Sequence, residues 1–307
     1  MFKYLLIIIF YILCFANTNA TNIKIKYKIN DKIITNLDII NEKKYLIFLR
    51  PNLENIPENE VLKLCENSLI RETIKNKELD KIFTNFDNEQ FINGIKKNLF
   101  NFKKVKNEKE FLSLLKENKI SYEKILKKVK NEGLWNELIF KKYNSLIKIN
   151  EKNLRRNLIE KMNNEKKFEY NLSELIFEIE INEKYEDKYK KILEYINKNS
   201  FKSAAYNFSI ANSANKGGEI GWIKETLLSQ NLNTKLKNLN IGDIIKPIKH
   251  PNGYLILKIN DKKEMKEIKN LDKELKEVIQ FEKNKQLNQF SLLFFKKLKQ
   301  NSVIYEY

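Results

Sequence analysis

Asn212-Ser213-Ala214-Asn215-Lys216-Gly217-Gly218-Glu219-Ile220-Gly221-Trp222 is the stretch of sequence that decides the fold of this chain. It holds three of the seven glycines in 307 residues, so glycine is scarce elsewhere. A cluster of this kind marks backbone that needs a positive φ or a close approach by another segment. Two further motifs follow it, GDIIKPI at residues 242–248 and GYLILK at residues 253–258. We therefore expect the glycine turn to organise the segment around it.

Residues 169–262 alternate between strand and helix patterns. We expect a strand at residues 172–181, helices at 185–198 and 201–208, a helix near 225–239 after the glycine turn, and a strand at 253–259. This order predicts a small α+β domain whose helices pack around one sheet.

The serial order of these motifs resembles the parvulin (PpiC-type) family of peptidyl-prolyl isomerases. In that family a Gly-Gly-acidic-aliphatic-Gly-aromatic turn precedes a helix of the substrate pocket. A turn with glycine and proline then leads into a last strand that reads Gly-Tyr/Phe-His-aliphatic. The resemblance implies a parvulin-like domain over residues 169–262, and an isomerase site that needs no cofactor and no metal.

The polar groups of the parvulin site are changed in this sequence. By resemblance, Glu174 takes the place of the first-strand histidine, because LSELI at residues 172–176 stands where the family reads LSHIL. The family's cysteine or aspartate falls on Ile210 or Ala211, and its last-strand histidine falls on Leu255. Leucine can neither donate nor accept a hydrogen bond. The resemblance therefore implies a catalytically degenerate site, with Glu174 as the catalytic candidate that is left.

The apolar part of the parvulin pocket is better preserved. The substrate-binding candidates are Ile220, Trp222, Leu228, Leu232 and Leu255. Two interpretations stay open: these residues form only the core of the domain, or they line a groove that binds extended apolar or proline-containing segments without isomerising them.

Four polar residues near the motifs need a separate interpretation. Glu174 either faces the site, where burial would raise its pKa or require a lysine partner, or faces solvent on an edge strand. We expect His250 to face solvent in its turn. We expect Ser209 and Ser213 to be turn and cap residues, because no base stands near them in a triad pattern.

The N-terminal part of the chain reads as a helical module. Residues 23–34 predict two short strands, with Ile23, Ile25, Tyr27 and Ile29 on one face. Thr35 and Asp38 form a capping box for a helix that runs to about Leu49. Further helices are expected at about 57–74, 88–99, 108–118, 124–143 and 150–162, with a linker at 163–167.

The order of strand, turn and capped helix resembles the start of the SurA-type periplasmic chaperones, as does the segment at residues 118–123 before its long helix. The chain ends with an expected helix at about 265–298 and a strand at 303–307. In SurA-type proteins these elements pack on the N-terminal module. The resemblance thus implies an α+β chain in which a helical module, residues 21–168 and 263–307, receives the parvulin-like domain as an insertion.

The first twenty residues resemble a secretory signal peptide. Lys3 is followed by an apolar run at residues 5–15, which is shorter than the ~20 residues that span a bilayer. Thr18 and Ala20 are small residues at the positions of a cut after Ala20. We expect an exported, periplasmic protein; an uncleaved membrane anchor is the alternative.

The composition is strongly basic, with a formal net charge of +18. The lysines are spread along every helix among glutamates, which indicates a coding bias and argues against a nucleic-acid partner. A weak attraction to anionic membrane lipids remains. Cys65 lies on an apolar helix face and is expected to be buried, and a single histidine with so few cysteines offers no zinc cluster.

These observations predict an ATP-independent periplasmic chaperone that holds unfolded outer-membrane or secreted polypeptides. Two alternatives stay open: an active peptidyl-prolyl isomerase, and a membrane-tethered scaffold. The candidate helix-face residues of the module, which either belong to its core or line an apolar crevice, are Ile39, Ile40, Leu46, Phe48, Leu64 and Leu138.

Overall fold

The computed structural model describes residues 22–84, 86, 88–162, 167–180, 182–265 and 270–307. The predicted signal segment and all but the last residue of the predicted linker lie outside these residues. Within the described part of the chain, no helix combines the length and the apolar character needed to cross a membrane.

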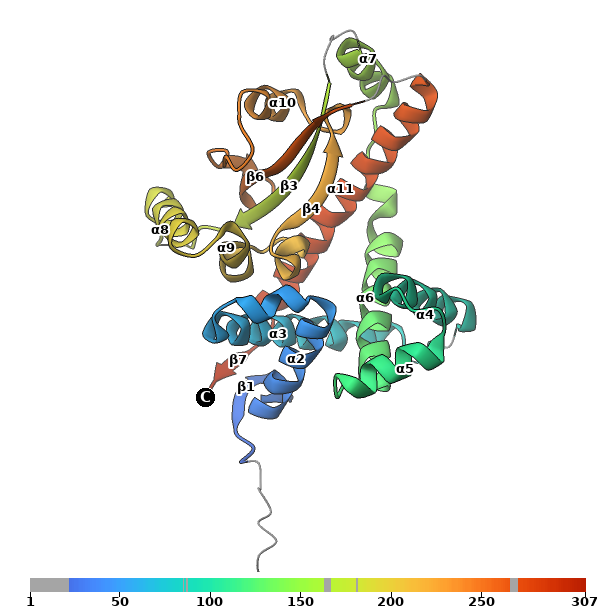
Figure 1. Ribbon diagram of the computed structural model, residues 1–307, viewed down its shortest axis with the longest axis vertical. Helices are drawn as coiled ribbons and strands as arrows, with labels where there is room; N and C mark the ends of the chain where they lie inside the picture. The colour runs from blue at the N-terminus through green and yellow to red at the C-terminus, as the bar shows by residue number, and fades with distance from the viewer. Residues whose placement is uncertain (1–21, 85, 87, 163–166, 181, 266–269) are drawn as a thin grey trace, which may run out of the picture.

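Most of the helical module lies at one end of the molecule and a small sheet with its helices lies at the other, whereas the helix at Glu151–Met162 lies beside the sheet and the helix at Leu271–Gln300 runs between the two ends (Figure 1). The module contains helices from both ends of the chain. These are α2 (Asn36–Leu49), α3 (Glu58–Ile82), α4 (Glu89–Lys103), α5 (Glu108–Glu117), α6 (Tyr122–Tyr143), α7 (Glu151–Met162) and α11 (Leu271–Gln300). The predicted capping box is present, since the Thr35 hydroxyl and the Asp38 carboxylate each accept a hydrogen bond from the other's backbone N–H.

A three-stranded antiparallel sheet joins the two ends of the described chain. Its order is β2 (Lys32–Thr35), β1 (Ile25–Ile29) and β7 (Ile304–Glu306). A bulge between Ile25 and Tyr27 breaks the alternation of β1. Tyr27 and Ile29 are buried, but Ile23 and Ile25 are 61% and 45% exposed, so the prediction that all four share one buried face is wrong.

The core of the helical module is built from segments far apart in sequence. Phe295, Leu298 and Ile304 pack on the buried residues of β1, α2 and α3. Trp135 of α6 stacks on Phe294 of α11 at 5.6 Å between ring centroids, and its indole N–H donates to the Ser291 hydroxyl at 2.9 Å. Of the candidate helix-face residues, five belong to the core and one faces solvent: Ile39, Leu46, Phe48, Leu64 and Leu138 are buried, and Ile40 is exposed.

The second unit is a four-stranded antiparallel sheet of order β4-β3-β6-β5. Its strands are β3 (Phe168–Phe177), β4 (Glu219–Lys224), β5 (Ile248–His250) and β6 (Gly253–Glu264), and its helices are α8 (Tyr185–Lys198), α9 (Phe201–Phe208) and α10 (Gln230–Lys237). Both α8 and α9 match the predicted ranges. The first strand starts earlier and ends earlier than predicted, and the expected helix at 225–239 is divided into a short 3-10 turn and α10.

The two faces of this sheet carry separate cores. One cluster includes Tyr170, Leu172 and Ile176 of β3 with Leu228 and Leu236, which flank or lie in α10. The other includes Leu175 and Phe177 with side chains of α8 and α9. Because successive strand residues point to opposite faces, the first cluster defines the face on which Glu174 lies.

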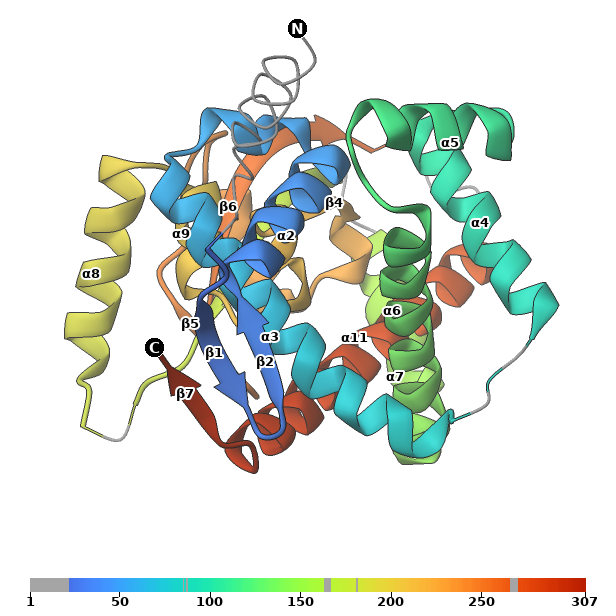
Figure 2. The ribbon, with the colours of Figure 1, turned by 90° about the horizontal axis from the view of Figure 1, so that it is seen from below.

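The sheet domain packs against the helical module through α3, α9 and α11 (Figures 1 and 2). Tyr206 of α9 belongs to the module's own core. The Arg71 guanidinium donates to the Ile210 carbonyl at 3.3 Å, and Lys296 pairs with Glu178 at 2.5 Å. The predicted fold class is thereby confirmed: an α+β chain whose helical module is completed by the C-terminal helix and contains an inserted α+β domain.

Candidate functional site

The glycine turn lies against the middle of β3. Gly217, Gly218 and Gly221 all have positive φ, between 66° and 80°, as the glycine cluster predicts. The Glu174 N–H donates to the Gly218 carbonyl at 2.7 Å. A Cβ on Gly218 would lie 2.2 Å from the Glu174 carbonyl oxygen, so a side chain has no space there.

Glu174 occupies a central strand, because β3 pairs with both β4 and β6. Its side chain is half-buried, and its Oε1 accepts a hydrogen bond from the Ser213 hydroxyl at 2.7 Å. Burial raises the pKa of Glu174, and the hydrogen bond from Ser213 opposes that rise in part. In the described part of the chain no lysine or arginine forms an ion pair with it. The solvent-facing, edge-strand interpretation of Glu174 is therefore wrong.

Ser213 is the residue that the sequence interpretation missed. The predicted turn role holds, since Ser213 lies in the 3-10 turn Asn212–Lys216, and its hydroxyl is in addition the polar partner of Glu174. Ser209, in contrast, keeps a structural role, since its hydroxyl accepts the backbone N–H groups of Ile176 and Ala211 at 3.1 and 3.2 Å. The available signal was the closeness of Ser213 to the glycine turn in sequence. Because that turn contacts Glu174, Ser213 could be expected near Glu174 as well.

Four of the five substrate-binding candidates come together on the Glu174 face of the sheet. Ile220, Leu228, Leu232 and Leu255 all belong to the apolar cluster on that face. Trp222 is not part of it: the residue is 41% exposed, and its ring lies 4.1 Å from the Lys263 ammonium. The candidate pocket is thus aliphatic, with Trp222 outside it.

The remaining family positions also lie in this cluster. Leu257 pairs with Glu174, and Leu255 pairs with Ile176. Leu255 therefore lies two residues along β6 from the residue opposite Glu174. Ala211 is buried in the cluster and Ile210 packs against it. At the family positions the site therefore presents the Glu174 carboxyl and the Ser213 hydroxyl beside aliphatic side chains, and neither an imidazole nor a thiol lies among these residues.

His250 and Cys65 take no part in this site. His250 lies on the edge strand β5 and is half-buried, which contradicts the expectation that it faces solvent. Its Nδ1 accepts the Asn252 N–H at 3.2 Å, and burial followed by the positive charge of Lys285 lowers its pKa. Cys65 is buried in the module, where burial raises its pKa to about 12, so its thiol stays protonated.

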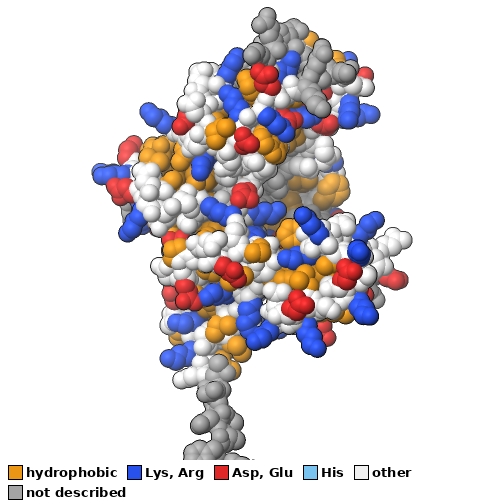
Figure 3. All heavy atoms as spheres, viewed as in Figure 1, with side chains coloured by type: hydrophobic (Ala, Val, Ile, Leu, Met, Phe, Trp, Pro, Cys, Tyr) orange, Lys and Arg blue, Asp and Glu red, His pale blue; other side chains and the backbone are white. Residues whose placement is uncertain are grey.

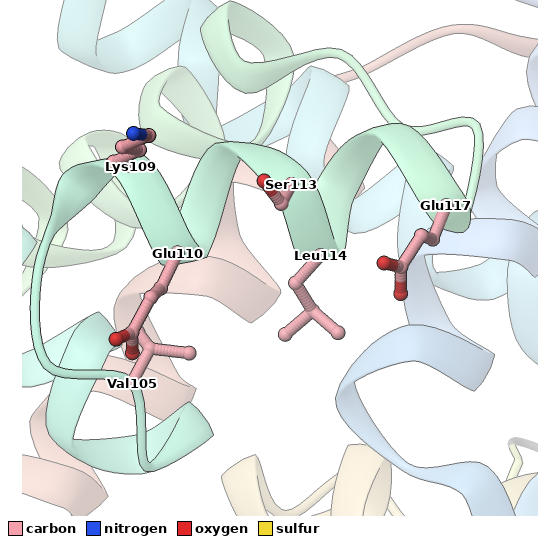
Figure 4. A pocket seen from close by; sticks show the side chains of 6 residues that line it. All are labelled: Val105, Lys109, Glu110, Ser113, Leu114 and Glu117. Carbon is pink, nitrogen blue, oxygen red and sulfur yellow. The ribbon is translucent and has the colours of Figure 1, made fainter.

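Two cavities lie away from the Glu174 face. One of about 480 Å³ lies on the opposite face of the sheet, where Asn260 donates to the Ser173 hydroxyl at 2.9 Å. The other, of about 340 Å³, is a shallow hollow on α5, where Leu114 lies between the carboxylates of Glu110 and Glu117 (Figure 4). Among the residues that the structure describes, no group of three or more His, Cys, Asp or Glu side chains could hold a metal ion.

Comparison with known proteins gives matches to both parts of the chain. Residues 177–261 match the family described as Rotamase, the PPIC-type PPIASE domain. The chaperone SurA of Pseudomonas aeruginosa is 36% identical over 63 residues, which cover 20% of this chain and 15% of that relative. The chaperone SurA of Buchnera aphidicola subsp. Schizaphis graminum is 28% identical over 315 aligned residues, which cover 94% of this chain and 68% of the relative.

Two solved structures are among those that match this chain. The peptidylprolyl isomerase PrsA of Bacillus anthracis is 21% identical, with a TM-score of 0.31 over 76% of this chain and 93% of that chain. A structure from a study of the Campylobacter jejuni SurA-like chaperones PEB4 and Cj1289 is 16% identical, with a TM-score of 0.39 over 92% of this chain and 98% of that chain.

Proposed function

Since this chain is a SurA-type protein that carries a PpiC-type domain, we propose that it is an ATP-independent periplasmic chaperone for unfolded outer-membrane or secreted polypeptides. The similarity to a SurA chaperone over 94% of the chain supports a role for the helical module and the domain together. Holding without ATP requires many weak contacts and rapid release. We also propose the division into a signal peptide at residues 1–20, a module at 21–168 and 263–307, and a PpiC-type domain at 169–262.

The composition of the Glu174 face carries the second part of the proposal, that the PpiC-type domain binds clients with little or no turnover. Isomerisation needs the twisted prolyl amide to be stabilised by polar groups that are already in position. The family's last-strand histidine position holds Leu255, and its thiol or carboxylate position holds Ala211 or Ile210, all within one apolar cluster. An aliphatic pocket of this kind favours binding of a proline ring or an apolar side chain.

An active isomerase is the second candidate, and the Glu174–Ser213 hydrogen bond is the observation that favours it. A half-buried carboxyl with a raised pKa, 2.7 Å from a hydroxyl, forms a positioned polar pair that can hydrogen-bond to a twisted prolyl amide and stabilise it. If this pair catalyses, Glu174→Gln and Ser213→Ala should each abolish turnover of a proline tetrapeptide while binding persists.

The test compares two activities of residues 21–307 at equal concentration: isomerisation of a proline tetrapeptide, and suppression of aggregation of an unfolded outer-membrane protein. The proposal expects suppression without turnover. Leu232→Ala should weaken client binding by the domain, whereas Leu112→Ala, at a position on α5 that is 44% exposed, is the matched control and should not. Turnover that depends on Glu174 would favour the second candidate.

The export proposal has its own test. Mass spectrometry of the protein recovered from the periplasm should show a chain that starts at Thr21. A chain that retains Met1 would support the membrane-tethered alternative. On the face that Figure 3 shows, the basic side chains are scattered over both units and mixed with acidic ones, without a continuous basic patch of the kind that binds nucleic acid.

A further inference from the structure

The sheet formed by β2, β1 and β7 has one buried face and one open face. Tyr27, Ile29 and Ile34 point into the module core. Lys28 pairs with Ile33 on one side and with Tyr305 on the other, so these three residues form a row across the open face. Ile33 and Tyr305 are 54% and 56% exposed. Ile33 and Tyr305 are therefore exposed to solvent at positions where polar residues would fit equally well.

More apolar side chains surround this row. The bulge in β1 leaves Ile25 on the exposed side, and the Tyr307 N–H donates to the Lys26 carbonyl, which places Tyr307 beside β1. The exposed large apolar residues near the sheet are Ile23, Ile25, Ile33, Leu37, Ile40, Val303, Tyr305 and Tyr307. We call this set with its lysines the sheet-end surface. Figures 1 and 2 show that it lies at one end of the molecule, away from the PpiC-type domain.

Positive charge predominates on the sheet-end surface, which also carries the acidic side chains of Asp31 and Glu306. Lys24 precedes β1, Lys26 and Lys28 lie in β1, and Lys32 begins β2; none of the four forms an ion pair with a residue that the structure describes. The nearby acidic groups have other partners, since Glu306 accepts from the Tyr27 hydroxyl and Asp31 lies 3.9 Å from the Lys77 ammonium. A partner of this surface must therefore tolerate apolar contact and supply negative charge.

We propose that the sheet-end surface docks on the headgroup region of an anionic lipid bilayer. Lysines bind anionic headgroups, tyrosines favour the boundary between headgroups and acyl chains, and isoleucines gain by leaving water there. A second copy of this chain is a poorer occupant, because two identical faces would bring their lysines together. In this arrangement the PpiC-type domain, at the far end of the molecule, points away from the bilayer. The inference goes beyond the proposed chaperone function and does not depend on it.

Co-flotation of residues 21–307 with vesicles tests this proposal without the apolar segment that precedes Thr21. We expect binding to phosphatidylglycerol-containing vesicles, little binding to pure phosphatidylcholine, and a loss of at least tenfold in affinity between low and high salt. The pair Lys26→Glu and Lys28→Glu should reduce vesicle affinity at least tenfold. The pair Ile33→Ser and Tyr305→Ser should reduce it as well, at unchanged charge.

The matched control is the pair Lys235→Glu and Lys237→Glu on α10, which makes the same change in net charge at exposed positions on the PpiC-type domain. The control should keep its vesicle affinity within twofold, and all variants should keep the wild-type circular dichroism spectrum. An equal loss in the control, or no binding to anionic vesicles, would overturn the proposal. Concentration-dependent dimers that are lost in the sheet variants, without lipid binding, would assign the surface to a second copy instead.

Discussion

Glu174 stands where the resemblance places the family histidine, and its surroundings bear on both candidate functions. Its carboxyl lies on a central strand, accepts the Ser213 hydroxyl, and has a raised pKa because of burial. The sequence could predict its strand and its correspondence to the family histidine. It could not predict the neighbours of β3, because strand order depends on pairing between segments that are distant in sequence.

Replacement of Glu174 by glutamine should stabilise the protein at neutral pH. The folded carboxyl has a raised pKa, so the folded state holds its proton more tightly, and stability falls as pH rises from the unfolded pKa through the folded pKa. Glu174→Gln removes that loss and keeps an acceptor for Ser213. We expect Tm to rise at pH 7 and the difference to vanish at low pH, where the carboxyl is protonated in both states.

The control for that measurement is Glu117→Gln, an exposed residue on α5, which should leave Tm unchanged at both pH values. A Tm difference for Glu174→Gln that persists undiminished at low pH would show that the carboxyl is not the cause.

Restoring histidines tests whether the lost polar groups limit turnover. In the double variant Glu174→His and Leu255→His, imidazoles stand where the resemblance places them, and positioned acid–base groups typically contribute ~10²–10⁴-fold. We expect tetrapeptide isomerisation to rise at least tenfold above the wild-type value, with Glu174→His alone remaining near it. Equal activities of the double variant and the wild type would indicate that the backbone and pocket determine the rate.

Among the elements, the glycine turn is the one that sequence predicted in most detail, down to its positive φ values. Two strands that follow in the sequence, β4 and β5, were harder to predict. The glycines of the turn interrupt the alternating pattern that would indicate β4. Strand β5 has three residues, too few to show alternation. Both strands owe their existence to pairing with β3 and β6, and the bulge in β1 likewise follows from tertiary contacts that no local pattern contains.

Two glycines of this turn form a matched pair for mutation. Gly218 and Gly221 both have φ of +80°, but a Cβ on Gly218 would meet the Glu174 backbone at 2.2 Å, whereas a Cβ on Gly221 would meet nothing within 4 Å. Gly221→Ala should cost only the ~1–2 kcal/mol of left-handed strain. Gly218→Ala should lower the free energy of unfolding by clearly more in urea denaturation; equal losses would contradict the close approach of the turn to β3.

At the scale of the whole molecule, α11 holds three regions together. Its first turns carry Glu274, which accepts from the Thr226 hydroxyl at 2.6 Å and from Lys224 at 2.9 Å. Leu292 joins the apolar cluster of the sheet domain, and Phe294 joins α6. The resemblance predicted that the last helix would complete the module, and the structure confirms that part. It could not predict the contacts with the domain, because those depend on the relative placement of the two units.

Trp135 is the residue whose loss should most weaken this assembly. It is 1% exposed, it stacks on Phe294, and it bonds to Ser291 across 156 residues of sequence. Trp135→Ala should lower the free energy of unfolding by ~3–5 kcal/mol, the usual range for a buried large aromatic residue. Phe140→Ala, on the same helix but 41% exposed, should cost far less in the same urea titration. Comparable losses in the two variants would contradict the α6–α11 contact as the main link.

The measurement that tests the central claim most directly pairs two assays on residues 21–307 at one concentration: proline tetrapeptide isomerisation and suppression of aggregation of an unfolded outer-membrane protein. The account predicts clear suppression with no turnover above the uncatalysed rate. Turnover that disappears in Glu174→Gln, or a failure to suppress aggregation, would contradict it.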